Sequence, residues 1–129
     1  MVKLSGVIIT YNEEEHLEKC LASLVGVVDE IIVVDSYSTD KTQEICKQFN
    51  VTFLQQKFLG YKEQKNFALE QANFDYILSL DGDEALSDTL KTSILKVKKT
   101  GNTLGTIAIE KIITVDNGFI FLIGIPIKS

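Results

Sequence analysis

The sequence predicts an α/β fold built on a mainly parallel β-sheet, and three observations support this prediction. Short apolar segments rich in β-branched residues alternate along residues 3–100 with segments whose apolar residues recur at helical spacing. Polar residues directly follow three of those short apolar segments. The chain has 129 residues, 45% of them hydrophobic, which is enough for one domain with a buried core. Strand–helix alternation of this kind implies crossover helices between parallel strands, as in a Rossmann-like sandwich.

Four strands and four helices are expected in alternating order. The strands are short and apolar, as in sheets buried on both faces, and are predicted over residues 3–10, 30–34, 51–55 and 76–80. The helices are predicted over residues 13–24, 40–49, 61–71 and from 88 onwards. Acidic residues in the first helical turn suit the positive end of the helix dipole, so Asn12 is the expected cap. Ser87 is expected to cap the last helix, with Leu90, Ile94 and Val97 on one face.

Composition and charge exclude several classes of protein. Thirteen lysines against eighteen acids give a net charge of -5, which argues against non-specific binding to nucleic acid. Cys20 and Cys46 have neither a metal-binding spacing nor a disulfide pattern, so they are expected to be core residues in a reducing compartment. No apolar run is long enough to span a bilayer, and no secretory pattern opens the sequence. We expect a cytoplasmic location, and peripheral contact with the inner face of the cytoplasmic membrane stays open.

Polar residues follow the predicted strands at their carboxyl ends. Residues 10–12 (Thr-Tyr-Asn) follow the first strand, Asp35 follows the second and residues 81–83 (Asp-Gly-Asp) follow the fourth. In open parallel sheets, ligands bind beyond the carboxyl ends of the strands. The sequence therefore predicts that these three segments meet at one binding edge.

The pair Asp81 and Asp83 carries the sharpest chemical signal. Two carboxylates one residue apart on a turn around Gly82 can share a hard cation such as Mg²⁺ or Mn²⁺ and leave positions for phosphate oxygens. The alternative is an ordinary surface turn, for which the same residues are suitable. Glu84 is either a further ligand or partner of this site, or a solvated acid at a helix start.

The other polar side chains at this edge each allow two interpretations. Asp35 either accepts hydrogen bonds from a ribose or base, or caps the helix that begins near Asp40. Tyr11 either stacks on a base or packs as an ordinary aromatic residue. Lys62 and Lys65 lie on the helix that opens after Gly60. One of these lysines pairs with a diphosphate, or both are solvated surface residues. His16, which has no second histidine or nucleophile nearby, is expected to be a surface residue.

Five motifs together resemble the family 2 inverting glycosyltransferases, most closely the branch of lipopolysaccharide core β-1,4-glucosyltransferases. The motifs are residues 8–13 (IITYNE), 33–36 (VVDS), 38–40 (STD), 60–61 with 64–66 (GY and QKN) and 78–84 (LSLDGDE). The resemblance covers about residues 3–100. It implies a GT-A nucleotide-sugar-binding fold, a nucleotide-diphosphate sugar donor such as a UDP-hexose, and a divalent metal.

The resemblance also assigns expected roles to residues of this chain. It places a donor site at Thr10, Tyr11, Asn12, Glu13, Asp35, Lys65, Asp81 and Gly82. Within that site, residues 10–12 would bracket the base, Asp35 would hold the base or ribose, and Lys65 would lie near the diphosphate. Asp81 would face the ribose or donor sugar, and Asp83, together with Asp81, would bind the metal.

The last 25 residues depart from the family pattern. Residues 1–104 are expected to form the donor-binding domain, whereas the acceptor half is missing, and no acid in residues 104–129 suits the catalytic base. Residues 105–121 read either as a hairpin around Val115–Gly118 or as the product of a frameshift after about residue 105. A frame moved back by one base permits codons for an arginine-, tyrosine- and tryptophan-bearing stretch like that of the family. The nucleotide sequence past residue 100 tests this hypothesis.

The expected activity is transfer of a hexose, with glucose one candidate, to a lipopolysaccharide core or another glycan or glycolipid acceptor, with inversion. One alternative is a non-catalytic fragment that binds a nucleotide sugar. Another is a sugar nucleotidyltransferase, which usually has a basic glycine-rich loop where this chain has Tyr11, Asn12 and a run of acids. The apolar segment 120–123 and an uncovered sheet edge also predict self-association.

Overall fold

The structure, a computed structural model, describes residues 3–74, 76–100, 111–115 and 118–124. The elements, in chain order, are β1 (Leu4–Thr10), α1 (Leu17–Leu24), β2 (Glu30–Asp35), α2 (Thr42–Cys46), β3 (Thr52–Gln55), α3 (Tyr61–Glu70), β4 (Tyr76–Asp81), α4 (Asp88–Thr100), β5 (Lys111–Val115) and β6 (Gly118–Gly124). The predicted alternation of strands and helices along residues 3–100 is therefore confirmed.

The strands form one six-stranded sheet in the order β3-β2-β1-β4-β6-β5. The first four strands of the chain pair in parallel, whereas β6 pairs antiparallel with both β4 and β5. The sheet is thus mainly parallel, as predicted. From β1 the chain adds β2 and β3 on one side and then crosses over to place β4 on the other. This reversal makes the carboxyl ends of β1 and β4 a topological switch point, the usual location of a ligand crevice.

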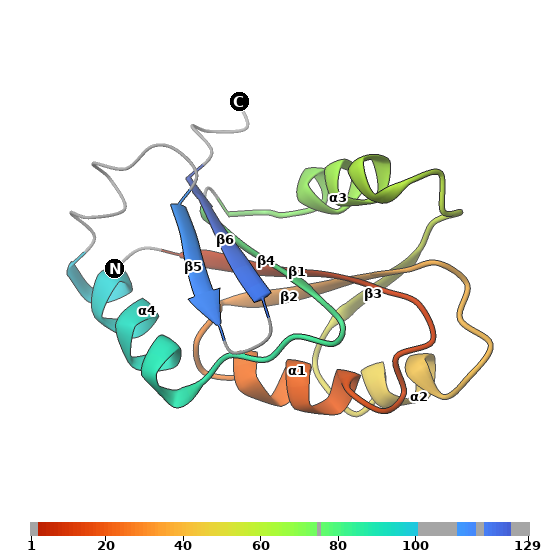
Figure 1. Cartoon of the computed structure of the whole chain (residues 1–129), viewed down its shortest axis with the longest axis horizontal. Coiled ribbons are helices and arrows are strands. Elements are labelled where there is room, and N and C mark those ends of the chain that lie inside the picture. Colours follow the sequence, from red (N-terminus) through yellow and green to blue (C-terminus); the bar gives the residue numbers. More distant parts are fainter. Residues whose placement is uncertain (1–2, 75, 101–110, 116–117, 125–129) are drawn as a thin grey trace.

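Helices cover both faces of the sheet (Figure 1). Alternate residues of the central strands point to opposite faces, so β1 contributes Ile8 to one apolar cluster and Val7 to the other. The first cluster contains Leu17 and Leu21 of α1 together with Cys46 of α2 and Ile94 of α4. The second contains Ala68 of α3. The molecule is a three-layer sandwich whose strands are buried on both faces, which explains their continuous apolar sequences.

The prediction that Asn12 caps the first helix is wrong. Helix α1 begins only at Leu17, and residues 13–16 form a turn in which Glu13 O accepts hydrogen bonds from the N–H groups of His16 and Leu17. Asn12 has a φ of 47° in the left-handed region, and its Oδ1 accepts a hydrogen bond from Thr39 N–H at 2.8 Å. Because that oxygen is used between loops, it does not cap the helix.

Other boundaries differ by a few residues. Helix α2 ends at Cys46 rather than continuing to Phe49, and β3 begins at Thr52. Ser87 directly precedes α4, and its carbonyl accepts the first-turn hydrogen bond from Lys91 N–H at 2.9 Å. Of the predicted face of α4, Ile94 is buried, whereas the side chains of Leu90 and Val97 lie outside the described residues.

Strands β5 and β6 pair so that Val115 is opposite Gly118, which is the pairing that the hairpin interpretation predicts. The turn residues 116–117 lie outside the described residues, and so do residues 101–110. The domain division at residue 104 and the frameshift hypothesis remain predictions. Among the helices that the structure describes, none is both long enough and apolar enough to cross a bilayer.

Candidate functional site

The register of the sheet brings the three predicted polar segments to one edge. Thr10 at the end of β1 is opposite Asp35 of β2, and Ile9 is opposite Asp81 of β4. The ends of β2, β1 and β4 are therefore level with one another, side by side. Parallel strands run in the same direction, so their carboxyl ends lie at the same edge of the sheet, and the register sets them level.

A cleft of about 440 Å³ opens at this edge, next to the ends of β1 and β4. Six of the predicted site residues line it: Thr10, Tyr11, Glu13, Asp81, Gly82 and Asp83. Four further polar or aromatic lining residues are Ser36, Phe58, Tyr61 and Gln64. The cleft thus has carboxylates from the β4 end and aromatic rings from two loops.

Two buried oxygen atoms at the cleft lack a hydrogen-bond partner among the described residues, namely Thr10 Oγ1 and Asp81 Oδ1. Burial raises the pKa of Asp81 above its ordinary value, the positive charge of Lys65 opposes this, and the nearby Asp83 adds to it. A buried carboxylate oxygen with no partner is costly unless a ligand or cation completes it. Asp81 Oδ1 is therefore an atom of the cleft that is available to a ligand or a cation.

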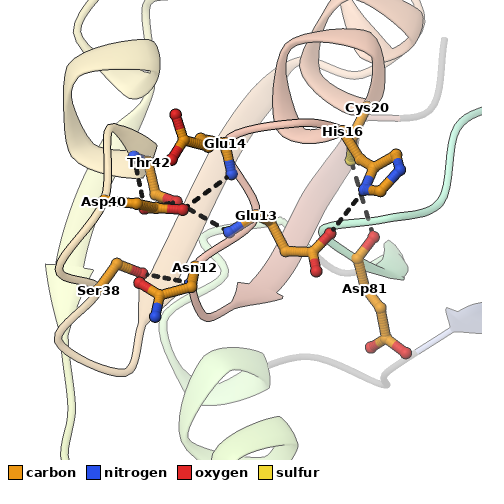
Figure 2. Close-up of polar contacts among 9 residues, drawn as sticks. All are labelled: Asn12, Glu13, Glu14, His16, Cys20, Ser38, Asp40, Thr42 and Asp81. Atoms are coloured by element: carbon orange, nitrogen blue, oxygen red, sulfur yellow. Dashed lines mark hydrogen bonds and ion pairs between the residues drawn. The ribbon is translucent and has the colours of Figure 1, made fainter.

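Glu84 holds the turn that contains the two aspartates. Its Oε1 accepts a hydrogen bond from Asp81 N–H at 2.7 Å, and its own N–H donates to Asp81 O at 2.9 Å. Burial raises the pKa of Glu84 above its usual value, although the hydrogen bond from Asp81 opposes this change. Glu84 is buried, so the interpretation of it as a solvated helix-start acid is wrong. Cys20 Sγ donates to Asp81 O at 3.9 Å and supports the same turn (Figure 2).

Asp35 lies fully buried at the end of β2 and is not among the described residues that line the cleft. Its Oδ2 accepts a hydrogen bond from Ser38 N–H at 2.8 Å, and its Oδ1 accepts one from Ser38 Oγ. The carboxylate therefore shapes the loop after β2 and not the start of α2, which begins at Thr42. The interpretation of Asp35 as a cap for that helix is wrong.

Aromatic side chains also line the cleft. Tyr11 is 56% exposed, so a planar ligand can reach its ring. Phe58 and Tyr61 pack edge to face with ring centroids 5.1 Å apart, on either side of Gly60. Gln64 of α3 is buried, and its Nε2 donates to Ser36 Oγ at 3.0 Å, which joins α3 to the loop after β2.

The basic residues near the site differ in their exposure and in the carboxylates that they lie beside. Lys65 is half-buried and close enough to Asp81 and Glu84 to oppose the rise in pKa of both carboxyls. Lys62, one turn earlier, is exposed. His16 is exposed, as predicted, and its Nδ1 lies 3.3 Å from Glu13 Oε2. Lys65 is thus the lysine that the fold places beside the carboxylates.

The residues present fit a hard divalent cation only in part. Among the described residues, no group of three or more histidine, cysteine or acidic side chains converges as a complete metal site. The unpartnered Asp81 Oδ1 and the exposed Asp83 nevertheless supply the carboxylate oxygens that Mg²⁺ and Mn²⁺ prefer. A site of two protein carboxylates completed by substrate phosphate oxygens is consistent with this donor set.

Several site residues were not recognised from the sequence. Ser36 and Gln64 stand inside two of the quoted motifs, but their hydrogen bond joins elements 28 residues apart, which no local pattern reveals. Phe58 precedes Gly60, whose φ of 138° turns the chain into α3. That glycine was the available signal for a tight turn carrying aromatic residues on both sides.

Comparisons with known sequences identify the family. Over residues 5–120 the chain matches the family described as Glycosyl transferase family 2. An uncharacterized glycosyltransferase of Rickettsia felis is 43% identical over 94 residues, covering 73% of this chain and 33% of the relative. The lipopolysaccharide core biosynthesis glycosyltransferase LpsC of Rhizobium meliloti is 39% identical over 93 residues, covering 68% of this chain and 34% of LpsC. The chain spans about a third of the length of the curated relatives it matches.

Solved structures share the same fold. Residues 1–349 of S. aureus TarS in complex with UDP align with a TM-score of 0.63 at 29% identity, over 76% of this chain and 32% of TarS. Glucosyl-3-phosphoglycerate synthase from Mycobacterium tuberculosis, in complex with Mn²⁺, UDP and glucosyl-3-phosphoglycerate, aligns with a TM-score of 0.56 at 25% identity, over 65% of this chain and 36% of the synthase. The expected GT-A fold is confirmed. The chain belongs to glycosyl transferase family 2.

Proposed function

We propose that this chain forms the donor-binding part of an inverting glycosyltransferase that uses a UDP-hexose, with glucose as the first sugar to test. The observation that carries the proposal is the single cleft lined by Tyr11, Asp81 and Asp83 at the switch point of the sheet. The complexes of TarS and the mycobacterial synthase with UDP support a uridine nucleotide. The similarity to LpsC supports a lipopolysaccharide core sugar or another surface glycan or glycolipid as acceptor.

The aromatic part of the cleft is suited to the nucleoside. In our proposal the exposed Tyr11 ring stacks on the base, and the unpartnered Thr10 hydroxyl hydrogen-bonds to the nucleotide. Glu13 borders the same space, and Asn12 fixes the loop between them. Ser36 borders the ribose and base end, and the buried Asp35 before it holds the loop after β2 through Ser38.

The acidic part of the cleft is suited to the diphosphate and sugar. Asp81 and Asp83 would hold Mg²⁺ or Mn²⁺, which when bound neutralises negative charge on a diphosphate leaving group. Asp81 also faces the ribose or donor sugar, and Gly82 lets the turn approach Thr10 closely. Lys65 adds a positive charge on the side where the diphosphate would lie. We place this activity in the cytoplasm, at the inner face of the cytoplasmic membrane.

Calorimetric titration of the full chain with UDP, in the presence and absence of Mn²⁺, tests the proposal. We expect UDP to bind and Mn²⁺ to tighten binding, and we expect Asp83→Asn to remove that metal dependence. Glu18→Gln on the exposed face of α1 is the matched control, because it also neutralises one carboxylate but lies outside the cleft. Absence of UDP binding under both conditions would overturn the donor proposal. Binding that ignores Mn²⁺ would overturn only the assignment of Asp81 and Asp83 to the metal.

The identity of the donor is tested in the same format. Competition of UDP-glucose, UDP-galactose and GDP-mannose against bound UDP ranks base and sugar separately. We expect both uridine donors to compete better than GDP-mannose, because the proposed nucleoside part of the cleft recognises the base. Incubation with UDP-glucose and a purified lipopolysaccharide core then asks whether this chain alone completes transfer.

A further inference from the structure

The loops after β1 and β2 are joined by four hydrogen bonds. Asn12 N–H donates to Ser38 Oγ at 2.8 Å, and Thr39 N–H donates to Asn12 Oδ1 at 2.8 Å. Glu13 N–H donates to Thr42 Oγ1 at 2.9 Å, and Glu14 N–H donates to Asp40 Oδ2 at 3.2 Å. Figure 2 shows three of these contacts, in which the N–H groups of Asn12, Glu13 and Glu14 meet the side chains of Ser38, Thr42 and Asp40. We call this set the loop clasp, made of Asn12, Glu13, Glu14, Ser38, Thr39, Asp40 and Thr42.

The loop clasp is anchored to the sheet through Asp35. Ser38 Oγ donates to Asp35 Oδ1 and accepts from Asn12 N–H, so one hydroxyl joins the end of β2 to the loop after β1. Thr42 links its other side in the same way. Its Oγ1 donates to Asp40 Oδ1 and accepts from Glu13 N–H. A hydroxyl that donates and accepts at once orients both neighbours, which makes the two loops one unit.

Each loop contains a residue in an unfavourable backbone conformation. Asn12 has a φ of 47° and Tyr37 a φ of 60°, in the left-handed region that side-chain-bearing residues seldom adopt. Such conformations persist only where surrounding contacts hold them, and they concentrate at binding sites. For Asn12, the contacts that hold it are those of the loop clasp, and Asn12 directly follows the exposed ring of Tyr11.

We propose that Asn12 and Thr42 are positioning residues that set nucleoside affinity by fixing Tyr11 and the loop after Asp35 before the nucleotide binds. This inference rests on the proposed function. Neither residue is among the described residues that line the cleft, and Thr42 is fully buried. The N–H and Oδ1 of Asn12 are already used by Ser38 and Thr39. Binding to loops that are already held in place costs less conformational entropy than binding that must first order those loops.

Substitutions at Thr42 separate positioning from contact. Thr42→Val keeps the shape of the side chain but removes the hydroxyl, which leaves Glu13 N–H without its acceptor and removes one of the three donors to Asp40. Thr42→Ser restores the hydroxyl. We expect Thr42→Val to weaken UDP binding about tenfold and Thr42→Ser to stay within about twofold of the unmodified chain. Thr92→Val, on the exposed surface of α4, is the control and should leave UDP affinity unchanged.

Substitutions at Asn12 test the same inference by keeping or removing the side-chain oxygen that accepts from Thr39 N–H. Asn12→Asp keeps an oxygen for Thr39 N–H and tolerates the left-handed conformation, whereas Asn12→Gly accepts the conformation but lacks the oxygen. If Asn12 acts by positioning, Asn12→Asp retains affinity within about threefold and Asn12→Gly loses about five- to tenfold. If its amide instead contacted the nucleotide, Asn12→Asp would bind as poorly as Asn12→Gly. Titration with uridine as well as UDP separates a loop effect from repulsion between a new carboxylate and the diphosphate.

Hydrogen–deuterium exchange of the free protein supplies the readout that does not depend on ligand. Residues 11–16 and 36–42 should exchange faster in Thr42→Val and Asn12→Gly, while β1 and α1 keep their protection. Mn²⁺-dependent tightening should survive in both variants, because it depends on Asp81 and Asp83. Unchanged exchange in these loops, or UDP affinity equal to the unmodified chain in both variants, overturns the inference. A chain that fails to bind UDP at all overturns the proposed function instead.

Discussion

The hydroxyl of Thr10 lies so close to the α-carbon of Gly82 that a methyl group on residue 82 would come within 2.5 Å of Oγ1. The strand end of β1 and the turn after β4 therefore pack against each other at the floor of the cleft. Gly82 N–H also donates to Ile9 O at 3.0 Å, which holds the two backbones together. Only a glycine permits this approach without displacing β1, where Thr10 is buried.

Gly82→Ala should therefore lower the free energy of unfolding by about 1–3 kcal/mol, as is usual for overpacking a rigid site. Urea denaturation followed by circular dichroism measures it. In the double variant Thr10→Ala with Gly82→Ala, the 2.5 Å contact is gone but the Thr10 Cβ at 3.0 Å remains, so only part of the stability should return. A Gly82→Ala chain that unfolds at the same urea concentration as the unmodified chain contradicts this packing argument.

Asp81→Asn should make the free protein more stable at neutral pH. Burial raises the pKa of Asp81, so the folded state binds this proton more tightly than the unfolded chain does. The associated stability is present below the unfolded pKa of about 3.9 and is lost as pH rises through the raised folded value. The stability advantage of the Asp81→Asn variant over the unmodified chain should thus be largest near pH 8 and vanish near pH 3.

Thermal unfolding of both chains between pH 3 and pH 8 measures this difference. The same substitution should abolish the tightening of UDP binding by Mn²⁺, because it removes the carboxylate charge. Equal pH profiles for the two chains would mean that the Asp81 carboxylate is already paired in the free protein.

Glu84 should be replaceable by glutamine but not by alanine. Glu84→Gln keeps an oxygen that accepts from Asp81 N–H, whereas Glu84→Ala leaves that N–H without its partner. We expect Glu84→Ala to cost about 1–3 kcal/mol of stability and to weaken Mn²⁺-dependent UDP binding, since the turn carrying Asp81 and Asp83 loses its support. Glu84→Gln should retain both properties. If Glu84→Gln loses metal dependence as completely as Asp83→Asn does, Glu84 is a metal ligand and not a support of the turn.

Both cysteines should be unreactive in the folded protein. Burial raises the pKa of Cys46 to about 11, with the charge of Asp35 adding to the effect, and burial raises that of Cys20 further. Because the thiolate is the reactive form, a disulfide reagent at pH 8 should modify neither group until the chain unfolds. The release of chromophore from the reagent, with and without guanidinium chloride, measures this. Rapid reaction of one thiol without denaturant would show that its helix opens locally.

The architecture was predictable from the sequence because its signals are local. The strands β1, β2 and β4 are buried on both faces, so their apolar runs are continuous and end at the polar residues Thr10, Asp35 and Asp81. Parallel pairing then places those ends together without further information. The side of the sheet on which the site would form, and most of the residues that line the cleft, followed from this rule.

The partners of individual polar side chains were not predictable, because they depend on distances between segments far apart in the chain. Asn12 looks like a helix cap in the sequence, yet it bonds to Thr39, 27 residues later. Asp35 resembles either a cap or a ligand contact, and its burial against Ser38 decides that it supports a loop. The sequence also left two roles open for Glu84, and its hydrogen bond from Asp81 N–H shows that it supports the turn.

The amino-acid sequence by itself determined the order of elements, the edge of the sheet at which polar groups gather and the family of the chain. These properties depend on periodicity and on short motifs, which can be recognised in the sequence without knowing how the chain packs. Only the tertiary structure decided which of the gathered groups face the cleft and which hold the loops in place. That division depends on burial and on competition among hydrogen-bond partners, and both arise only when the loops after β1 and β2 pack against each other.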